Sequence, residues 1–158
     1  MKTHAELVAI ARAHAAAEGQ GDLATTLATL EPEPVYELQP IGRVMRGLAA
    51  ARVYYEHFFA QFRPLVRGFE LRSEWVTTEG VGQEYVITLR SPTGGSERHH
   101  VIGILTFGKE ALSGERVYAS EPLLRLMLGP AFDLTEPLRG TPPYLRPGMP
   151  RKRGVERR

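Results

Sequence analysis

Three residues, Tyr36, His99 and Glu115, have side chains that can bind a ligand or move a proton. All three are predicted to lie on the same face of a sheet. Tyr36 lies in a short predicted strand, and His99 and Glu115 lie in two later ones. A histidine titrates near neutral pH and burial raises the pKa of a glutamate, so such a pair can act as acid and base in an apolar cavity. We therefore predict catalytic roles for His99 and Glu115 and a ligand contact for Tyr36, since a buried tyrosine commonly hydrogen-bonds through its hydroxyl.

A plainer interpretation of the two ionisable residues stays open. His99 can lie at an open rim, with Arg98 and His100 in solvent, and Glu115 can pair with an arginine. The alternation of side chains places His99 and Glu115 on the same face but does not set the register of their hairpin. Only the register decides whether they meet.

The strands that would position these residues are predicted from a period of two. Residues 69–75 and 83–89 alternate apolar and polar side chains, and turn-type sequences at residues 77–80 and 91–95 separate the runs. Consecutive strands should therefore pair antiparallel. Residues 101–107 are apolar on both faces, which favours cover by helices on one side and by a second subunit on the other.

The first half of the chain has helical spacing instead. We predict helices over residues 4–18, after Asp22 and over residues 47–62, with a short strand at residues 34–38. The alternation along the strands and the apolar stripe of the long helix predict a largely apolar cavity between sheet and helix, which suits a flat, hydrophobic small molecule. The simpler interpretation of the aromatic residues on the helix is that they belong to the hydrophobic core. The predicted ligand-binding residues are Tyr36, Leu38, Tyr55, Phe59, Trp75, Tyr85, Val101 and Val117.

Composition excludes several kinds of site. The 158 residues include no cysteine, so disulfides, thiolate nucleophiles and sulfur-ligated zinc are ruled out. The adjacent His99 and His100 point to opposite faces of a strand and cannot chelate one metal together. No phosphate-binding loop or dinucleotide fingerprint occurs, so we expect neither a metal nor a cofactor. No apolar run of membrane-spanning length and no signal sequence is present, which favours a cytoplasmic protein.

The charge is concentrated at the C-terminus. The net charge is +2, whereas residues 151–158 alone carry five basic side chains against one acidic residue. A Pro/Gly-rich stretch precedes this tail, and no aromatic residues are interleaved in it. We expect a solvated, disordered end, with no membrane partner and no nucleic-acid partner beyond a non-specific tail contact.

The order of these elements, VYELQP before the long helix and SGERVYASEPLLRLMLG after the last strands, resembles the nuclear transport factor 2-like superfamily, and in particular its SnoaL-like branch of polyketide cyclase-like proteins. The resemblance implies an α+β fold, a conical barrel of a curved, mainly antiparallel sheet wrapped around N-terminal helices. It also implies homodimers packed through the sheet, and the exposed positions Ile102 and Ile104 favour the convex face for that contact. We predict a domain over residues 1–129 and a Pro/Gly-rich extension with a basic tail over residues 130–158. Members include isomerases, cyclases, epoxide hydrolases, dehydratases and binding modules, so the fold does not choose the function.

Comparison with two characterised branches argues against the catalytic mechanisms of epoxide hydrolases and steroid isomerases for this chain. Aligned on the epoxide hydrolases that resemble this fold, the catalytic acid falls on Val117 and the water-holding Asn falls on Leu38, so only Tyr36 is retained. The carboxylate base and the oxyanion hole of steroid isomerases cannot be placed from the sequence either. Three hypotheses remain: a cofactor-free acid/base enzyme acting on a hydrophobic ring-containing substrate, a non-catalytic ligand-binding or accessory protein, and an interaction module that uses the basic tail.

Overall fold

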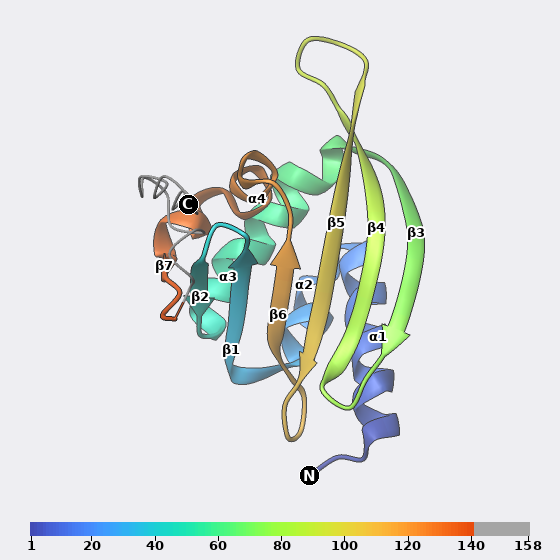
Figure 1. The fold of residues 1–158 in the computed structure, drawn as a ribbon, viewed down its shortest axis with the longest axis vertical. Coiled ribbons are helices and arrows are strands. Elements are labelled where there is room, and N and C mark those ends of the chain that lie inside the picture. Colours follow the sequence, from blue (N-terminus) through green and yellow to red (C-terminus); the bar gives the residue numbers. More distant parts are fainter. Residues whose placement is uncertain (141–158) are drawn as a thin grey trace, which may run out of the picture.

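The computed structural model describes residues 1–140, in which N-terminal helices lie against one face of a curved sheet (Figure 1). Helix α1 spans His4–Gln20 and begins at a capping box, in which Thr3 and Glu6 satisfy each other's backbone N–H groups. Gly21 ends α1 in the left-handed conformation, with φ at 75°. The short helix α2, Leu23–Ala28, begins at Asp22, whose carboxylate accepts a hydrogen bond from the N–H of Thr25.

Seven strands form the sheet in the order β3-β4-β5-β6-β1-β2-β7. Neighbouring strands are antiparallel except β1 and β6, which are parallel. The predicted α+β fold, with N-terminal helices on a curved and mainly antiparallel sheet, is confirmed. The strands are β1 Leu30–Gln39, β2 Arg43–Arg46, β3 Val66–Val76, β4 Gly80–Arg90, β5 Ser96–Phe107, β6 Leu112–Tyr118 and β7 Glu136–Pro137.

The predicted helix over residues 47–62 changes its period part of the way along. Helix α3 spans Leu48–His57, a π-helical turn follows at Phe58–Phe62, and a 3-10 turn at Arg63–Leu65 contains Pro64. A π turn has more residues per turn than an α-helix, so side chains beyond His57 no longer follow the 3.6-residue stripe. This change decides which aromatic rings face the sheet.

Ordered structure continues beyond residue 129, where the sequence had suggested that the domain ends. Helix α4, Glu121–Leu128, leads into a 3-10 turn at Gly129–Leu134, and β7 then adds a short edge to β2. Ala131 and Phe132 are buried in the core, and Arg125 stacks on the Phe132 ring. The predicted basic tail, residues 151–158, lies outside the described residues. Within the described part, no helix has the length and apolar character that a membrane crossing requires.

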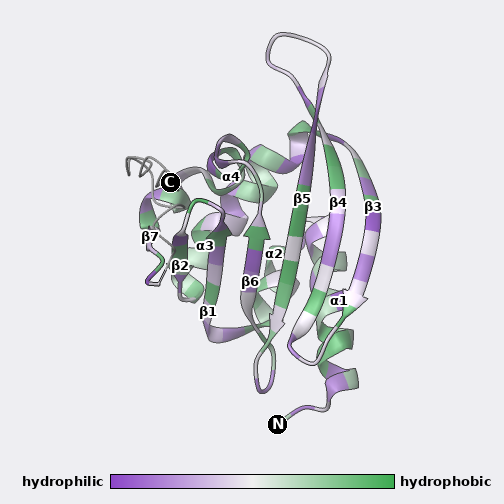
Figure 2. Ribbon diagram, in the orientation of Figure 1, coloured by the Kyte–Doolittle hydropathy of each residue, from purple (hydrophilic) through white to green (hydrophobic). Residues whose placement is uncertain are grey.

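The two halves of β5 differ in character, as Figure 2 shows. The half beside the hairpin tip, which contains His99 and His100, is hydrophilic, and the half from Val101 to Phe107 is hydrophobic. On the convex face of the hydrophobic half, Ile102 is 36% exposed and lies opposite Tyr118, which is 40% exposed. The polar half extends away from the core, and the apolar half crosses it.

Candidate functional site

A cavity of about 580 Å³ lies between the concave face of the sheet, helix α1 and the π turn that follows α3. Its wall is mainly aromatic and aliphatic, as is common for sites that bind small apolar ligands. Apolar side chains on it include Phe58, Phe62, Phe69, Ile87, Leu105 and Met127. The polar and charged side chains are few, namely Glu18, Arg63, Gln83, Tyr85 and Glu115.

Glu115 is enclosed by protein, and its carboxyl faces the cavity. Strand β6 places it opposite Leu105 of β5 and beside Tyr36 of β1. Its Oε1 atom lies 2.5 Å from the point where a Cβ on Gly103 would stand, so the missing side chain of Gly103 leaves space for the carboxyl. Within residues 1–140 Glu115 has no hydrogen-bond or ion-pair partner, and the arginine partner that the sequence left open is not found there.

The environment of Glu115 favours its protonated form. Removal from bulk water raises its pKa from 4.5 to about 8, and the nearby negative charge of Glu18 adds to this effect. The side chain retains a small surface facing the cavity, but that surface does not give it the solvation of open water. At neutral pH Glu115 is therefore a neutral carboxylic acid that can donate a hydrogen bond.

Tyr85 supplies a second donor next to Glu115. Its Cε1 atom lies 3.7 Å from the same Cβ position above Gly103, so the two side chains flank one small space. Burial raises the pKa of Tyr85 well above 10, and the charges of Glu115 and Glu18 act in the same direction, which keeps the hydroxyl neutral. Within residues 1–140, the Tyr85 hydroxyl has no hydrogen-bond partner. Two neutral O–H donors therefore face the cavity without protein partners.

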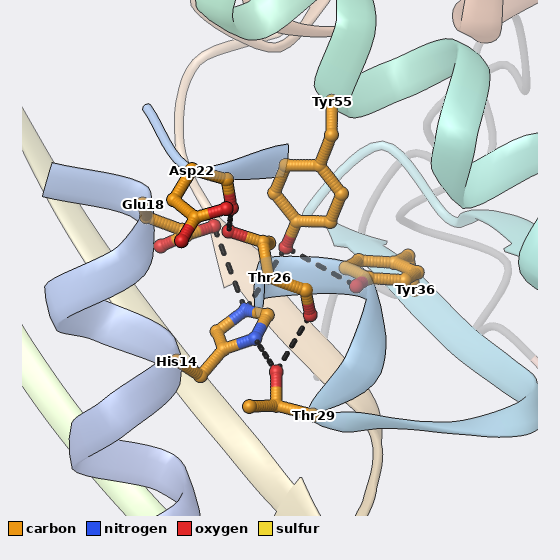
Figure 3. Close-up of polar contacts among 7 residues, drawn as sticks. All are labelled: His14, Glu18, Asp22, Thr26, Thr29, Tyr36 and Tyr55. Atoms are coloured by element: carbon orange, nitrogen blue, oxygen red, sulfur yellow. Dashed lines mark hydrogen bonds and ion pairs between the residues drawn. The ribbon is translucent and has the colours of Figure 1, made fainter. Parts of the chain in front are cut away.

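A hydrogen-bonded chain lies beside the cavity, on the α1 side (Figure 3). The Nε2 atom of His14 is 3.0 Å from the Tyr55 hydroxyl and 3.6 Å from Oε1 of Glu18, and the Tyr55 hydroxyl is 3.2 Å from that of Tyr36. On its other side, Nδ1 of His14 lies 2.6 Å from Oγ1 of Thr29. His14 and Tyr55 are completely buried, so the hydrogen bond between them is isolated from solvent, whereas the Glu18 side chain is 26% exposed.

Of the predicted site residues, Tyr85 and Glu115 line the cavity. Several of the others are buried behind its wall and belong to the core, namely Tyr36, Leu38, Tyr55, Val101 and Val117. Phe59 does not line the cavity either, because the π turn brings Phe58 and Phe62 there instead. The spacing of residues along a strand or helix predicts which face a side chain lies on. Packing within the core then decides which side chains on that face reach the cavity.

Trp75 lies on the opposite face of the sheet from the predicted one. The pairing of β3 with β4 shifts between Leu71 and Ser73, so one extra residue interrupts the alternation there. After this bulge Trp75 pairs with Gly82, and its ring occupies the space over that glycine on the convex side. Glu74 takes the concave side, where its carboxylate accepts a hydrogen bond from Gln83.

The structure does not bring His99 and Glu115 together. Glu115 pairs with Leu105, which lies six residues beyond His99 on β5, a separation of roughly 20 Å along a strand. His99 lies opposite Ile87 and 3.8 Å from the carboxylate of Glu97. This is the rim position that the sequence left as the alternative, so His99 cannot be the acid/base partner of Glu115 in this arrangement.

Two ionisable residues of α1 were not predicted as part of the site. His14 and Glu18 are four residues apart and therefore lie on one face of the helix, and His14 continues the buried stripe that Leu7 and Ala11 begin. A histidine on an apolar stripe, followed one turn later by a glutamate, was the available signal. Within the described part of the chain, no three His, Asp or Glu side chains lie close enough together to hold a metal ion.

Comparisons with known proteins agree with this fold. The family model described as SnoaL-like domain matches residues 11–112. Among curated proteins, none matches the chain significantly. An NTF2-like protein of unknown function from Cytophaga hutchinsonii has 10% identity and a TM-score of 0.61, over 72% of this chain and 99% of that one.

Two further solved structures have the same fold. The epoxide hydrolase/cyclase-like enzyme SalBIII, described in pyran ring formation in the polyether salinomycin, is 16% identical with a TM-score of 0.61, over 77% of this chain and 96% of that one. A protein from Catenulispora acidiphila with a ketosteroid isomerase-like fold, solved with trimethylamine, is 16% identical with a TM-score of 0.54, over 78% of this chain and 95% of that one. At these identities the similarity establishes the shared fold, and no activity follows from it.

Proposed function

We propose that this chain, which belongs to the SnoaL-like domain family, binds a hydrophobic, ring-containing small molecule in its cavity and transfers a proton on it without a cofactor. The observation that carries the proposal is the placement of Glu115: a carboxyl without a protein partner at the wall of an apolar cavity, beside the Tyr85 hydroxyl. Burying such a group costs free energy, and a ligand oxygen would recover part of it by accepting the hydrogen bond.

The arrangement supports specific roles for three residues. Glu115 and Tyr85 donate hydrogen bonds to a substrate oxygen and stabilise the negative charge that develops there. Hydrogen-bond donors in an apolar, water-excluding site stabilise such charge more strongly than donors in water. Glu18, at the same cavity, accepts the proton released from a neighbouring substrate carbon. The C–H bond breaks, an O–H bond forms on Glu18, and the electron pair moves toward the substrate oxygen. Return of the proton to a different carbon completes an isomerisation.

The lining supports a substrate with rings rather than a flexible polar one. Phe58, Phe62 and Phe69 present aromatic rings to the cavity, and flat apolar ligands bury well against such surfaces. SalBIII, which has the same fold, is described in pyran ring formation. An acid at a substrate oxygen can assist both ring-forming and ring-isomerising chemistry, and this is the role proposed for Glu115.

The test uses cyclic ketones of graded size, incubated with the protein in D₂O. Hydrogen exchange at the carbon next to the carbonyl, followed by NMR, reports proton transfer directly, whatever product the natural reaction forms. We expect hydrogen exchange that Glu115→Gln and Glu18→Gln each reduce by about a hundredfold, the usual cost of losing one transition-state donor or one general base. Glu84→Gln, which removes an exposed carboxylate from the outer face of β4, is the matched control. Equal exchange in Glu115→Gln and wild type would contradict the role of Glu115.

A second candidate function is ligand binding without chemistry. It is favoured by the rim of the cavity, where Phe69 is 59% exposed on the edge strand β3 and offers an apolar entrance. Native mass spectrometry of the purified protein would detect a retained ligand. If ketones bind but exchange no hydrogen in wild type, the binding function is the correct one.

A further inference from the structure

The mouth of the cavity can be located from the exposure of its lining residues. Most of them are buried or half-buried, and the exposed ones are Gly19, Arg63, Pro64 and Phe69. These residues come from the end of α1, from the 3-10 turn in the segment that joins α3 to β3, and from β3 itself (Figure 1). Solvent therefore reaches the cavity on this side. Among the described lining residues, Arg63 is the only cation.

The guanidinium of Arg63 is held in place, but its charge is not neutralised by the protein. Its Nη2 atom donates a hydrogen bond to the carbonyl oxygen of Gly19 at 2.7 Å, which caps the end of α1. Its Nη1 atom lies 3.5 Å from the point where a Cβ on Gly21 would stand, so that glycine leaves room for the group. Within residues 1–140 no carboxylate pairs with Arg63, and Glu18 lies beside His14 instead. The cap uses one of the several N–H donors of the guanidinium, and the others stay available at the mouth.

The charges along the cavity favour an anion at the mouth and a neutral oxygen at the inner end. Burial and the charge of Glu18 act on Glu115, and the charge of Arg63 is not among the influences on it. A negative ligand group placed beside Glu115 and Glu18 would lose its hydration and meet repulsion. At Arg63 the same group keeps contact with water and gains the planar pair of donors that matches a carboxylate.

We propose that Arg63 binds a carboxylate of the ligand, so that the ligand is a ring-containing keto acid whose carboxylate lies at the mouth and whose ketone oxygen reaches Glu115 and Tyr85. The inference rests on the proposed function, which places a substrate oxygen at these two donors. It adds the class of substrate and the direction in which the substrate enters.

The sheet order gives the length of such a ligand. Arg63 lies just before β3, and Glu115 lies on β6, three strand spacings away in the order β3-β4-β5-β6. Three spacings amount to roughly 14 Å along the sheet, and the curvature shortens the direct path across its concave face. The ligand is therefore longer than a single six-membered ring.

The test compares a decalone that carries a propionic acid side chain with the primary amide of the same compound. The two probes differ in charge and little in shape, and calorimetry gives the affinity of each. We expect wild type to bind the acid about tenfold more tightly than the amide, and Arg63→Gln to bind both equally. Only the ratio of the two affinities is used. A loss of the α1 cap would weaken both probes alike and leave that ratio unchanged.

Arg67→Gln is the matched control. It removes a positive charge from the start of β3, at an exposed position that does not line the cavity, and should leave the ratio at the wild-type value. If Arg63→Gln does not fold without the cap, Arg63→Lys keeps a donor for Gly19 and loses the planar fork, and the ratio should fall about threefold. A wild type that does not prefer the acid, or an equal preference in wild type and Arg63→Gln, would overturn the proposal.

Failure of the proposed function has a different signature. It would appear as absent hydrogen exchange in D₂O for both ketones in wild type. A preference for the acid that depends on Arg63 would then still support the carboxylate site, and the protein would be a binding protein for keto acids.

Discussion

Replacing Glu115 by Gln should make the protein more stable at high pH, and the gain should grow as the pH rises. In the folded state the pKa of Glu115 is raised from 4.5 to about 8, so between these values the folded protein holds a proton that the unfolded chain has released. Stability then falls as the pH rises through this window, because the unfolded state binds fewer protons. Glutamine keeps the shape of the side chain and cannot ionise.

The size of the effect follows from the shift. Each pH unit within the window is worth up to about 1.4 kcal/mol, so the full shift of Glu115 has an upper limit of about 5 kcal/mol. Water that enters the cavity reduces this value, and we expect a difference on the order of 2–3 kcal/mol between pH 5 and pH 9. Domains of this size are stable by roughly 5–15 kcal/mol, so such a change is readily measured.

The assay is urea unfolding of both proteins at pH 5, 6, 7, 8 and 9. Taking the difference between variant and wild type at each pH cancels the groups that the two proteins share. We expect a difference that rises steadily and levels off above pH 8. Glu84→Gln, on the exposed face of β4, controls for the loss of one negative charge. A difference that is the same at pH 5 and pH 9 would refute the assignment of Glu115 as a buried neutral acid.

Three further predictions concern other parts of the molecule. Gly103→Ala would place a Cβ 2.5 Å from Oε1 of Glu115, so the carboxyl must turn away, and ketone affinity measured by calorimetry should fall roughly tenfold; undiminished affinity would contradict the contact. Ile102 and Tyr118 lie exposed on the convex face, so sedimentation at micromolar concentration should report a homodimer that Ile102→Lys dissociates, and a wild-type monomer would exclude that interface. Thr3→Ala removes the α1 capping box and should cost about 1 kcal/mol in urea unfolding, with an unchanged midpoint counting against that cap.

Much of the architecture could be predicted from local patterns. The period of two along β4, β5 and β6 places Tyr85, Gly103 and Glu115 on one face, and all three line the cavity. Capping and turn residues marked α1 and α2 near their true ends. Strand alternation and helix caps depend on the backbone geometry of a few neighbouring residues, so they can be predicted directly from the sequence.

The composition of the site was decided by contacts between distant segments. One extra residue in β3 turned Trp75 to the outer face, a π turn exchanged Phe59 for Phe58 and Phe62, and the β5–β6 register separated His99 from Glu115. None of these can be read from alternation, because each depends on how two elements align.

What the sequence by itself determined is the set of faces: which side chains of each strand and helix point toward the core. The tertiary structure alone decided that the carboxyl of Glu115 stands unpaired over Gly103, and that His14 meets Tyr55. The physical reason is that the acidity of a carboxyl and the direction of a hydrogen bond depend on everything that surrounds them in space. For Glu115, those surroundings are assembled from segments as far apart in the chain as α1 and β5.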